Sequence, residues 1–239
     1  MSKINLEYIF PTALYTVQLD NMEKTHKDLI KYIYSLKGTD KQKLEHKKYK
    51  ASSQGGWHSS FLDTDVPQVN ALCQKLFPLI NPIVEGLGWD LETYTIECDD
   101  MWSIINPKYA YNTSHVHKGS LLSVAYYLKV PKGGNSGSFV IKDPRSSAAF
   151  FPPTLLKKDK NGINIEGTQD PSTIGCQDGQ SNAIEIDPKE GLMLIFPSWL
   201  EHKVTQNLSD EEDPDRIVIS FNVSQGMNHI PLKNKKTKK

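Results

Sequence analysis

The residues with the clearest capacity for chemistry are three histidines and one arginine in the second half of the chain. His115 and His117 form a His-x-His pair, His202 follows much later, and Arg216 comes shortly after it. Imidazole nitrogens are ligands for iron and other first-row transition metals. A guanidinium can bind a carboxylate through two parallel hydrogen bonds. The four residues together predict a mononuclear iron site that also accepts an anionic cosubstrate.

Each of these residues stands beside an apolar run that is typical of a β-strand. If His115 and His117 share one strand, their side chains lie on the same face, because strand side chains alternate between faces. His202 follows the run GLMLIFPSWLE, and Arg216 begins RIVISFN. Taken singly, such histidines are usually surface or core residues and such an arginine is usually an ion-pair partner. It is their order along the chain that favours the metal site.

The elements that must position these residues can be predicted from periodicity. An opening strand is expected at 7–18, a helix at 21–37, and a helical stretch at 66–87 that Pro78 and Pro82 kink or divide. From Tyr94 onward the apolar period changes to two. Strands are then expected at 94–106, 120–130, 137–143, 182–187, 191–196 and 216–224. Helices followed by strands predict a mainly β, α+β fold, a barrel or two-sheet sandwich with a helical buttress.

The chain is predicted to form one domain, 1–232, followed by a basic tail at 233–239. Within it we expect helical support at 1–92, a β-barrel core at 93–226, and an insertion at 143–180. This insertion has little periodicity and much Pro, Gly, Ser and Asp, which is typical of a lid. The loop at 41–60 is a second candidate lid.

Composition narrows the partners and the compartment. Lys+Arg and Asp+Glu balance at 28 each, so net charge favours neither nucleic acid nor an anionic surface. No apolar run is long enough for a signal peptide or a membrane span. Cys73, Cys98 and Cys176 are odd in number and widely spaced, which indicates a reducing compartment. A cytoplasmic protein is therefore expected.

Several longer motifs stand in a fixed order: IFPTALY, GGWHS, NTSHVHKGSLLSVAYYLKVP, GSFVIKDPR, GLMLIFPSWLEHKV and RIVISFN. In this they resemble the 2-oxoglutarate- and Fe(II)-dependent oxygenases common in marine bacteria and tailed phages, within the prolyl-hydroxylase-like superfamily. The resemblance covers most of the chain, and it is weakest from 146 to 182. It implies a double-stranded β-helix, the cupin-like jelly-roll barrel, with iron at one open end. A phage-encoded protein would act in the host cytoplasm.

The resemblance also implies roles for individual residues. His115, His117 and His202 fall where such enzymes keep their metal ligands, and Arg216 falls where they anchor the distal carboxylate of 2-oxoglutarate. Tyr127 and Ser220 are hydroxyl donors that could share that carboxylate. Candidates for the substrate pocket are Trp57, His58, Trp102 and Asn106. The implied cofactors and cosubstrates are Fe(II), 2-oxoglutarate and O₂.

The chain departs from the family pattern around His117. This histidine occupies a position that is Asp or Glu in better characterised relatives, and Lys118 stands where the family often has Pro. Three ligand sets remain open. All three histidines could bind the metal, or His117 and His202 could be the only protein ligands, with Gly119 in the carboxylate position and a halide as a further ligand. In the third, Asp143 supplies an oxygen ligand from a neighbouring strand.

The favoured function is a dioxygenase that hydroxylates an unidentified protein or small-molecule substrate. One alternative is a non-catalytic jelly-roll module that binds a carbohydrate or a phage structural protein. Another is a three-His cupin dioxygenase that does not use 2-oxoglutarate. The oligomeric state stays open, and a homodimer is compatible with the sequence.

Overall fold

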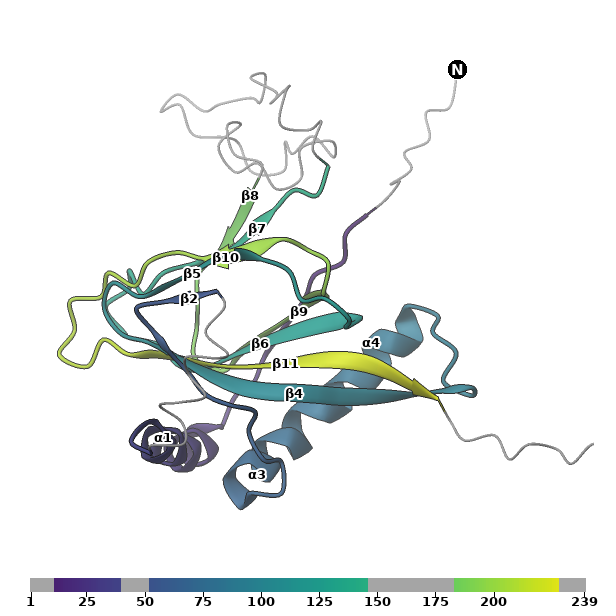
Figure 1. The fold of residues 1–239 in the computed structure, drawn as a ribbon, viewed down its shortest axis with the longest axis horizontal. Helices are drawn as coiled ribbons and strands as arrows, with labels where there is room; N and C mark the ends of the chain where they lie inside the picture. The colour runs from purple at the N-terminus through teal and green to yellow at the C-terminus, as the bar shows by residue number, and fades with distance from the viewer. Residues whose placement is uncertain (1–10, 40–51, 146–182, 228–239) are drawn as a thin grey trace, which may run out of the picture.

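Two antiparallel sheets face each other in the computed structural model, which describes residues 11–39, 52–145 and 183–227. The strands of the larger sheet are, in order, β1 (Tyr15–Gln18), β9 (Leu192–Pro197), β6 (Leu122–Lys129), β11 (Arg216–Met227), β4 (Tyr94–Asn106) and β3 (Trp57–His58). The strands of the smaller sheet are, in order, β2 (Ser53–Gln54), β5 (Tyr111–His115), β10 (His202–Val204), β7 (Phe139–Lys142) and β8 (Ala183–Ile186). Figure 1 shows the smaller sheet above the larger one.

Helices cover the outer face of the larger sheet. They are α1 (Glu23–Lys37), α3 (Pro67–Leu76), the 3₁₀ turn η1 (Phe77–Leu79) and α4 (Ile80–Gly86). Figure 1 shows α1 and α3 beneath β11 and β4, with α4 behind the right-hand part of β11. The helical stretch predicted at 66–87 is thus confirmed, and it is divided at Pro78, whose missing N–H interrupts the helical ladder.

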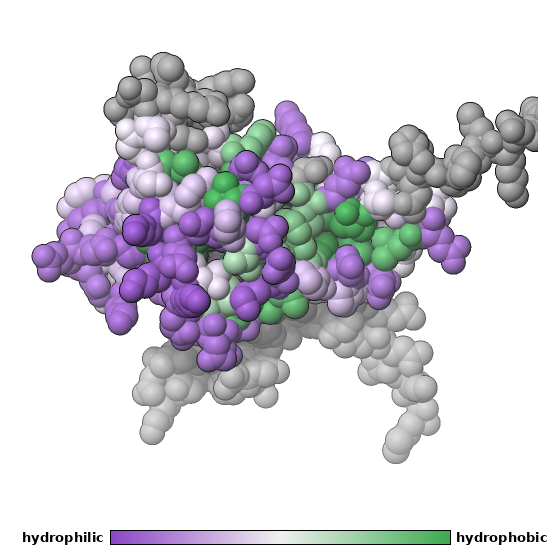
Figure 2. All heavy atoms as spheres, turned by 90° about the horizontal axis from the view of Figure 1, so that it is seen from below, coloured by the Kyte–Doolittle hydropathy of each residue, from purple (hydrophilic) through white to green (hydrophobic). Residues whose placement is uncertain are grey.

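The main core lies between these helices and the sheet. Phe77 packs edge-to-face on Phe221 of β11, with ring centroids 5.4 Å apart. On α1, the buried His26 forms a hydrogen bond through Nε2 with the hydroxyl of Tyr126 on β6, at 2.6 Å. It forms another through Nδ1 with the carboxylate of Glu190, at 3.0 Å. Figure 2, seen from the helical side, shows a mostly hydrophilic surface with apolar residues gathered in the region of α4. The helices therefore pack against one face of the barrel and bury it.

The inner faces of the two sheets enclose a second, smaller apolar cluster. Its buried members are Tyr127, Phe139, Ile141, Leu194, Phe196 and Leu200. The central strands β6 and β9 are buried on both sides, which explains their near-continuous apolar sequences. Most side chains between the two sheets are therefore apolar. The polar side chains among them line the cavity described below.

Two expectations about local structure need correction. Only Tyr15–Gln18 of the predicted opening strand forms a strand among the described residues. His115 and His117 do not share a strand, because His115 is the last residue of β5 and His117 lies beyond it.

Other expectations fall on residues outside the described part of the chain. These are most of the lid at 143–180, most of the loop at 41–60, and the basic tail at 233–239. No helix among the described residues has both the length and the apolar character needed to cross a membrane.

Candidate metal centre and cosubstrate pocket

Strand pairing brings the three histidines together. β10 lies between β5 and β7, and His202 is the direct partner of His115 in the register. The ring centroids of His115 and His202 are 4.3 Å apart, and that of His117 lies 5.2 Å from each. One nitrogen from each ring falls within 4.8 Å of the others. Three imidazoles that converge in this way fit a single divalent transition metal.

All three histidines use Nδ1 in a hydrogen bond to a neutral oxygen. The acceptors are the carbonyl of Thr113 for His115 at 2.7 Å, Oδ1 of Asn222 for His117 at 2.9 Å, and the carbonyl of Leu200 for His202 at 2.8 Å. Because a carbonyl oxygen can only accept, each Nδ1 carries the proton and each Nε2 keeps its lone pair. This is the tautomer that a metal requires when it binds through Nε2.

Burial favours the neutral form of these rings. It lowers the pKa of His115 and His117, and it lowers the pKa of His202 to about 3, with the nearby His115 as a further cause. At neutral pH no proton has to leave before a metal binds. The donor set is thus prepared for a cation without a change of protonation.

The lowered pKa values predict that the metal-free protein loses stability in acid. The unfolded chain binds protons below the ordinary histidine pKa of 6.5, whereas folded His202 does so only near 3. Stability is therefore full above pH 6.5 and falls as the pH drops from there toward 3, by up to about 5 kcal/mol at about 1.4 kcal/mol per pKa unit. Urea unfolding between pH 7.5 and 4.5 measures this loss. A His202→Gln variant should show a shallower pH dependence, and an equal slope would contradict the assignment.

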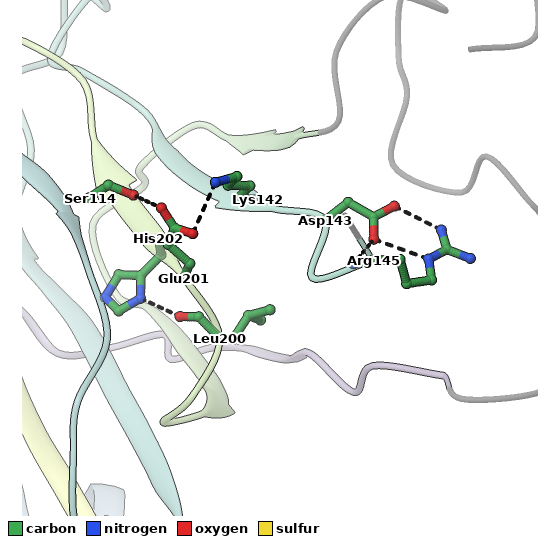
Figure 3. A network of polar contacts seen from close by, with 7 residues as sticks. All are labelled: Ser114, Lys142, Asp143, Arg145, Leu200, Glu201 and His202. Carbon is green, nitrogen blue, oxygen red and sulfur yellow. Dashed lines mark hydrogen bonds and ion pairs between the residues drawn. The ribbon is translucent and has the colours of Figure 1, made fainter. Parts of the chain in front are cut away.

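Acidic residues near the histidines are engaged elsewhere. Figure 3 shows the carboxylate of Glu201 directed away from the imidazole of His202, toward Ser114 at 2.7 Å and Lys142 at 3.1 Å. Both oxygens of Asp143 bind Arg145, at 2.8 and 3.0 Å (Figure 3). Among the described residues the candidate metal group contains three histidines and no carboxylate.

The site opens into a cavity of about 240 Å³ between the two sheets. Its polar lining includes the three histidines, and its apolar lining includes Phe139, Phe196, Val204 and Val218. Arg216 lies in the same cavity, at the start of β11, in register with Asn106 of β4. A metal at the histidines and an anion at Arg216 would therefore share one enclosed space.

Arg216 is a buried cation without a carboxylate partner in the described part of the chain. Its exposed fraction is 0%, and its Nη1 donates to the carbonyls of Ser136 and Gly137, the latter at 2.9 Å. Nε and Nη2 have no acceptor among the described atoms. Burial lowers the pKa of Arg216, which reflects the cost of holding this charge away from water. Two free parallel donors on a buried guanidinium fit a carboxylate.

Two hydroxyl residues line the cavity together with Arg216. Tyr127 is buried, and its pKa rises to about 12, mainly through burial and against the influence of Arg216. Ser220 lies on β11 on the same inward face as Arg216. Both line the cavity, so each is placed to contribute to an anion site.

Gly137 allows the backbone to approach Arg216. Its φ is +85°, and a Cβ there would collide with the carbonyl of Thr205 and lie 2.7 Å from Nη1 of Arg216. We expect Gly137→Ala to destabilise the protein by about 1–2 kcal/mol through the left-handed backbone. It should also weaken 2-oxoglutarate binding, because the guanidinium must move.

Gly134→Ala is the matched control for this prediction. Gly134 has φ +77°, and a Cβ built there has no atom within 4 Å. Alanine at this position therefore introduces backbone strain without a steric collision. Thermal unfolding and 2-oxoglutarate titration separate the two effects. Equal cosubstrate affinity in both variants would show that Gly137 does not position Arg216.

The candidate substrate residues lie in two places. His58, Trp102 and Asn106 line the cavity, with His58 stacked on Trp102 at 5.7 Å and Trp102 5.6 Å from the His117 ring. Trp57 belongs to the core on the helical side and does not line the cavity. Among the polar residues that line the cavity, the sequence analysis missed Ser52, Asn112 and Asn222. Asn222 had a signal, because it is the last residue of the RIVISFN motif.

This arrangement, a two-sheet barrel with converging histidines and a buried arginine in one cavity, offers a metal and an anion adjoining sites. Residues 100–222 match the family model described as "Putative 2OG-Fe(II) oxygenase". The chain belongs to this family, and it is a 2-oxoglutarate-dependent dioxygenase. Fe(II), 2-oxoglutarate and O₂ are the cofactor and cosubstrates of the family, which argues against a non-catalytic module.

Solved structures share the fold at low sequence identity. A viral collagen prolyl hydroxylase from Paramecium Bursaria Chlorella virus-1, in complex with 2-oxoglutarate, is 14% identical, with a TM-score of 0.51 over 90% of this chain and 96% of that chain. A prolyl-4-hydroxylase of Pseudomonas putida is 11% identical, with a TM-score of 0.52 over 90% and 94%. HygX from Streptomyces hygroscopicus, with nickel and 2-oxoglutarate bound, is 12% identical, with a TM-score of 0.53 over 89% and 83%. The predicted double-stranded β-helix is confirmed.

No curated protein matches the chain closely enough to carry a name or an activity to it.

Proposed function

We propose that Nε2 of His115, His117 and His202 binds Fe(II) and that Arg216 anchors 2-oxoglutarate for the oxidation of a substrate C–H bond. The observation that carries this proposal is the presence, in one cavity, of three lone pairs and one unpartnered guanidinium. The hydrogen bonds at Nδ1 support the use of all three histidines. A two-His site with Gly119 in place of a carboxylate would leave His115 unused, although one of its nitrogens lies within 4.8 Å of those of His117 and His202.

The protein residues in this proposal orient the reactants and exclude water. When bound, Fe(II) supplies the O₂ chemistry of the family, in which 2-oxoglutarate is converted to succinate and CO₂ while the substrate is oxidised. The fixed Nδ1–H donors hold the imidazoles in place before the metal arrives. Phe139, Phe196 and Val218 provide an apolar wall that strengthens electrostatic contacts inside the cavity.

Arg216 selects the cosubstrate by shape and charge. Its Nε and Nη2 lie side by side and offer two donors to the distal carboxylate of 2-oxoglutarate. Tyr127 and Ser220 add hydroxyl contacts to that carboxylate in this proposal. The distal carboxylate would thereby become the partner that the buried guanidinium lacks in the described residues.

The substrate side of the cavity is proposed to be the wall formed by His58, Trp102 and Asn106. The stack of His58 on Trp102 offers an aromatic surface beside His117. Asn106 Oδ1 and Trp102 Nε1 are buried without a partner among the described atoms, so an acceptor and a donor remain for a bound molecule. The substrate is a protein side chain or a small molecule. A phage-encoded origin and a homodimeric state remain predictions, and light scattering tests the latter.

Succinate formation is the test of this function. Purified protein with Fe(II), 2-oxoglutarate and O₂ should form succinate, slowly without substrate, and should form none when either Fe(II) or O₂ is withheld. A protein that consumes O₂ on a substrate without 2-oxoglutarate would be a three-His cupin dioxygenase. Absence of any metal binding would instead favour a non-catalytic jelly-roll module.

A further inference from the structure

We propose that Asn222 is the positioning residue that makes His117 a metal ligand, as part of a buried hydrogen-bonded ring with Ser123 and Ser198. The inference rests on the proposed function, because it takes His117 to bind Fe(II). It concerns how this chain supports a histidine where relatives have a carboxylate. None of the three supporting side chains is itself a ligand.

The ring begins and ends at His117. Its Nδ1 donates to Oδ1 of Asn222 at 2.9 Å, and Ser123 Oγ donates to the same oxygen at 3.1 Å. Ser123 Oγ also lies 3.0 Å from Ser198 Oγ, and the carbonyl of Ser198 accepts the backbone N–H of His117 at 2.9 Å. Three other segments of the chain, at β6, just after β9 and at β11, are thereby tied to His117, just beyond β5.

The direction of each hydrogen bond in the ring follows from donor counting. Ser123 gives its one hydroxyl proton to Asn222, so the proton between the two serines must come from Ser198. In this arrangement Asn222 Oδ1 accepts two hydrogen bonds, from His117 Nδ1 and from Ser123 Oγ. An amide turned the other way would donate to Nδ1 and move the imidazole proton to Nε2. That tautomer cannot bind a metal through Nε2.

His117 needs this support more than the other two histidines. His115 and His202 donate to carbonyls two residues earlier in their own segments, so their orientation is set locally. His117 lies beyond the end of β5, and its acceptor lies on β11, far along the chain. Ser123 and Ser198 are buried, with exposed fractions of 0% and 1%, so water cannot readily replace them. Asn222 therefore supplies from another strand what the local backbone gives to His115 and His202.

The test compares Co(II) affinity and the Co(II) absorption spectrum of the wild type with those of a set of variants. Asn222→Ala removes the acceptor, and Asn222→Asp keeps an acceptor of the same shape that cannot donate. Asn112→Ala is the matched control, because it removes another hydrogen-bonded amide from the same cavity wall without touching a histidine. Equilibrium dialysis measures affinity, and thermal unfolding without metal measures the general structural cost.

We expect Asn222→Ala to weaken Co(II) binding about 10- to 100-fold and to alter the spectrum, the usual effect of losing the partner of a ligating histidine. Asn222→Asp should restore both the affinity and the spectrum, and Asn112→Ala should bind Co(II) like the wild type. Ser123→Ala should weaken binding less than Asn222→Ala. The two changes combined should weaken it no further than Asn222→Ala alone, because they act through one ring.

His117→Ala separates the possible failures. If it weakens Co(II) binding while Asn222→Ala does not, the ligand set stands and this inference is wrong. If His117→Ala itself binds Co(II) like the wild type, the proposed ligand set is wrong. Equal losses in Asn222→Ala and Asn112→Ala would show a general structural effect and overturn the inference. Should Asn222→Ala not fold, Asn222→Asp decides, and a spectrum like that of His117→Ala would contradict the proposal.

Discussion

Alanine at His115, His117 or His202 is expected to lower Fe(II) affinity by on the order of 100-fold or more. Structural metal sites with four ligands are worth about 10–16 kcal/mol, or about 3 kcal/mol for each ligand, and about 1.4 kcal/mol corresponds to a factor of ten. Competition with a chromophoric chelator under anaerobic conditions measures the affinity. Because all three nitrogens lie within 4.8 Å of one another, we expect three similar losses.

His58→Ala is the control for these variants. His58 lines the same cavity and stacks on Trp102, but it is not part of the histidine cluster. It should bind Fe(II) like the wild type. If His117→Ala also retains wild-type affinity, His117 is a neighbour of the ligands. If all three alanine variants retain it, the metal binds elsewhere.

Replacement of Arg216 by Met is expected to abolish tight 2-oxoglutarate binding and to leave the ligand-free protein at least as stable. The guanidinium is fully buried, and two of its three nitrogens lack a partner among the described atoms. A buried charge without a counter-ion costs several kcal/mol, so an apolar side chain of similar length removes that cost. Loss of the ion pair between the guanidinium and the carboxylate of 2-oxoglutarate should weaken its binding by about 2–5 kcal/mol, a factor of roughly 30 to several thousand.

The thermal shift on adding 2-oxoglutarate to the metal-loaded protein measures this prediction. The wild type should be stabilised, and Arg216→Met should show no shift. Arg216→Lys should show a small shift, because lysine keeps the positive charge but lacks the two parallel N–H donors of a guanidinium. Arg145→Met is the control, since Arg145 is paired with Asp143 on the surface. An Arg216→Met protein that still binds 2-oxoglutarate like the wild type would remove Arg216 from the anion site.

Strands with a strong apolar signal could be predicted from the sequence with close bounds. β4 was expected at 94–106 and is Tyr94–Asn106, and β9 differs by one residue at each end. β6 and β9 are recognisable because both of their faces are buried, which leaves a nearly unbroken apolar run. The division of the second helical stretch was also predictable, because Pro78 has no N–H to donate.

The strands that carry two of the histidines could not be predicted in the same way. β5 reads YNTSH and β10 reads HKV, and neither has an apolar pattern of its own. They are strands because β10 pairs with β5 on one side and with β7 on the other, a tertiary cause that local propensity does not contain. The order of His115, His117, His202 and Arg216 suggested a shared site, and the structure brings them to one cavity. Their roles stay predictions until metal and cosubstrate binding are measured.

Features that depend on distant contacts were beyond the sequence. Asn222 ends the RIVISFN motif, but the motif does not say which residues it contacts: β11 and β6 bring it next to Ser123 and His117. The unpartnered nitrogens of Arg216 are equally invisible, since they depend on which atoms surround the guanidinium. Trp57, which the sequence suggested for the pocket, packs on the helical side, because adjacent residues of β3 face opposite ways.

The most direct test of the account is an anaerobic crystal structure of the protein with Fe(II) and 2-oxoglutarate. We predict one iron bound by Nε2 of His115, His117 and His202, with the distal carboxylate of 2-oxoglutarate on Nε and Nη2 of Arg216. Iron held by fewer than three of these histidines, or a 2-oxoglutarate carboxylate that does not contact Arg216, would contradict it.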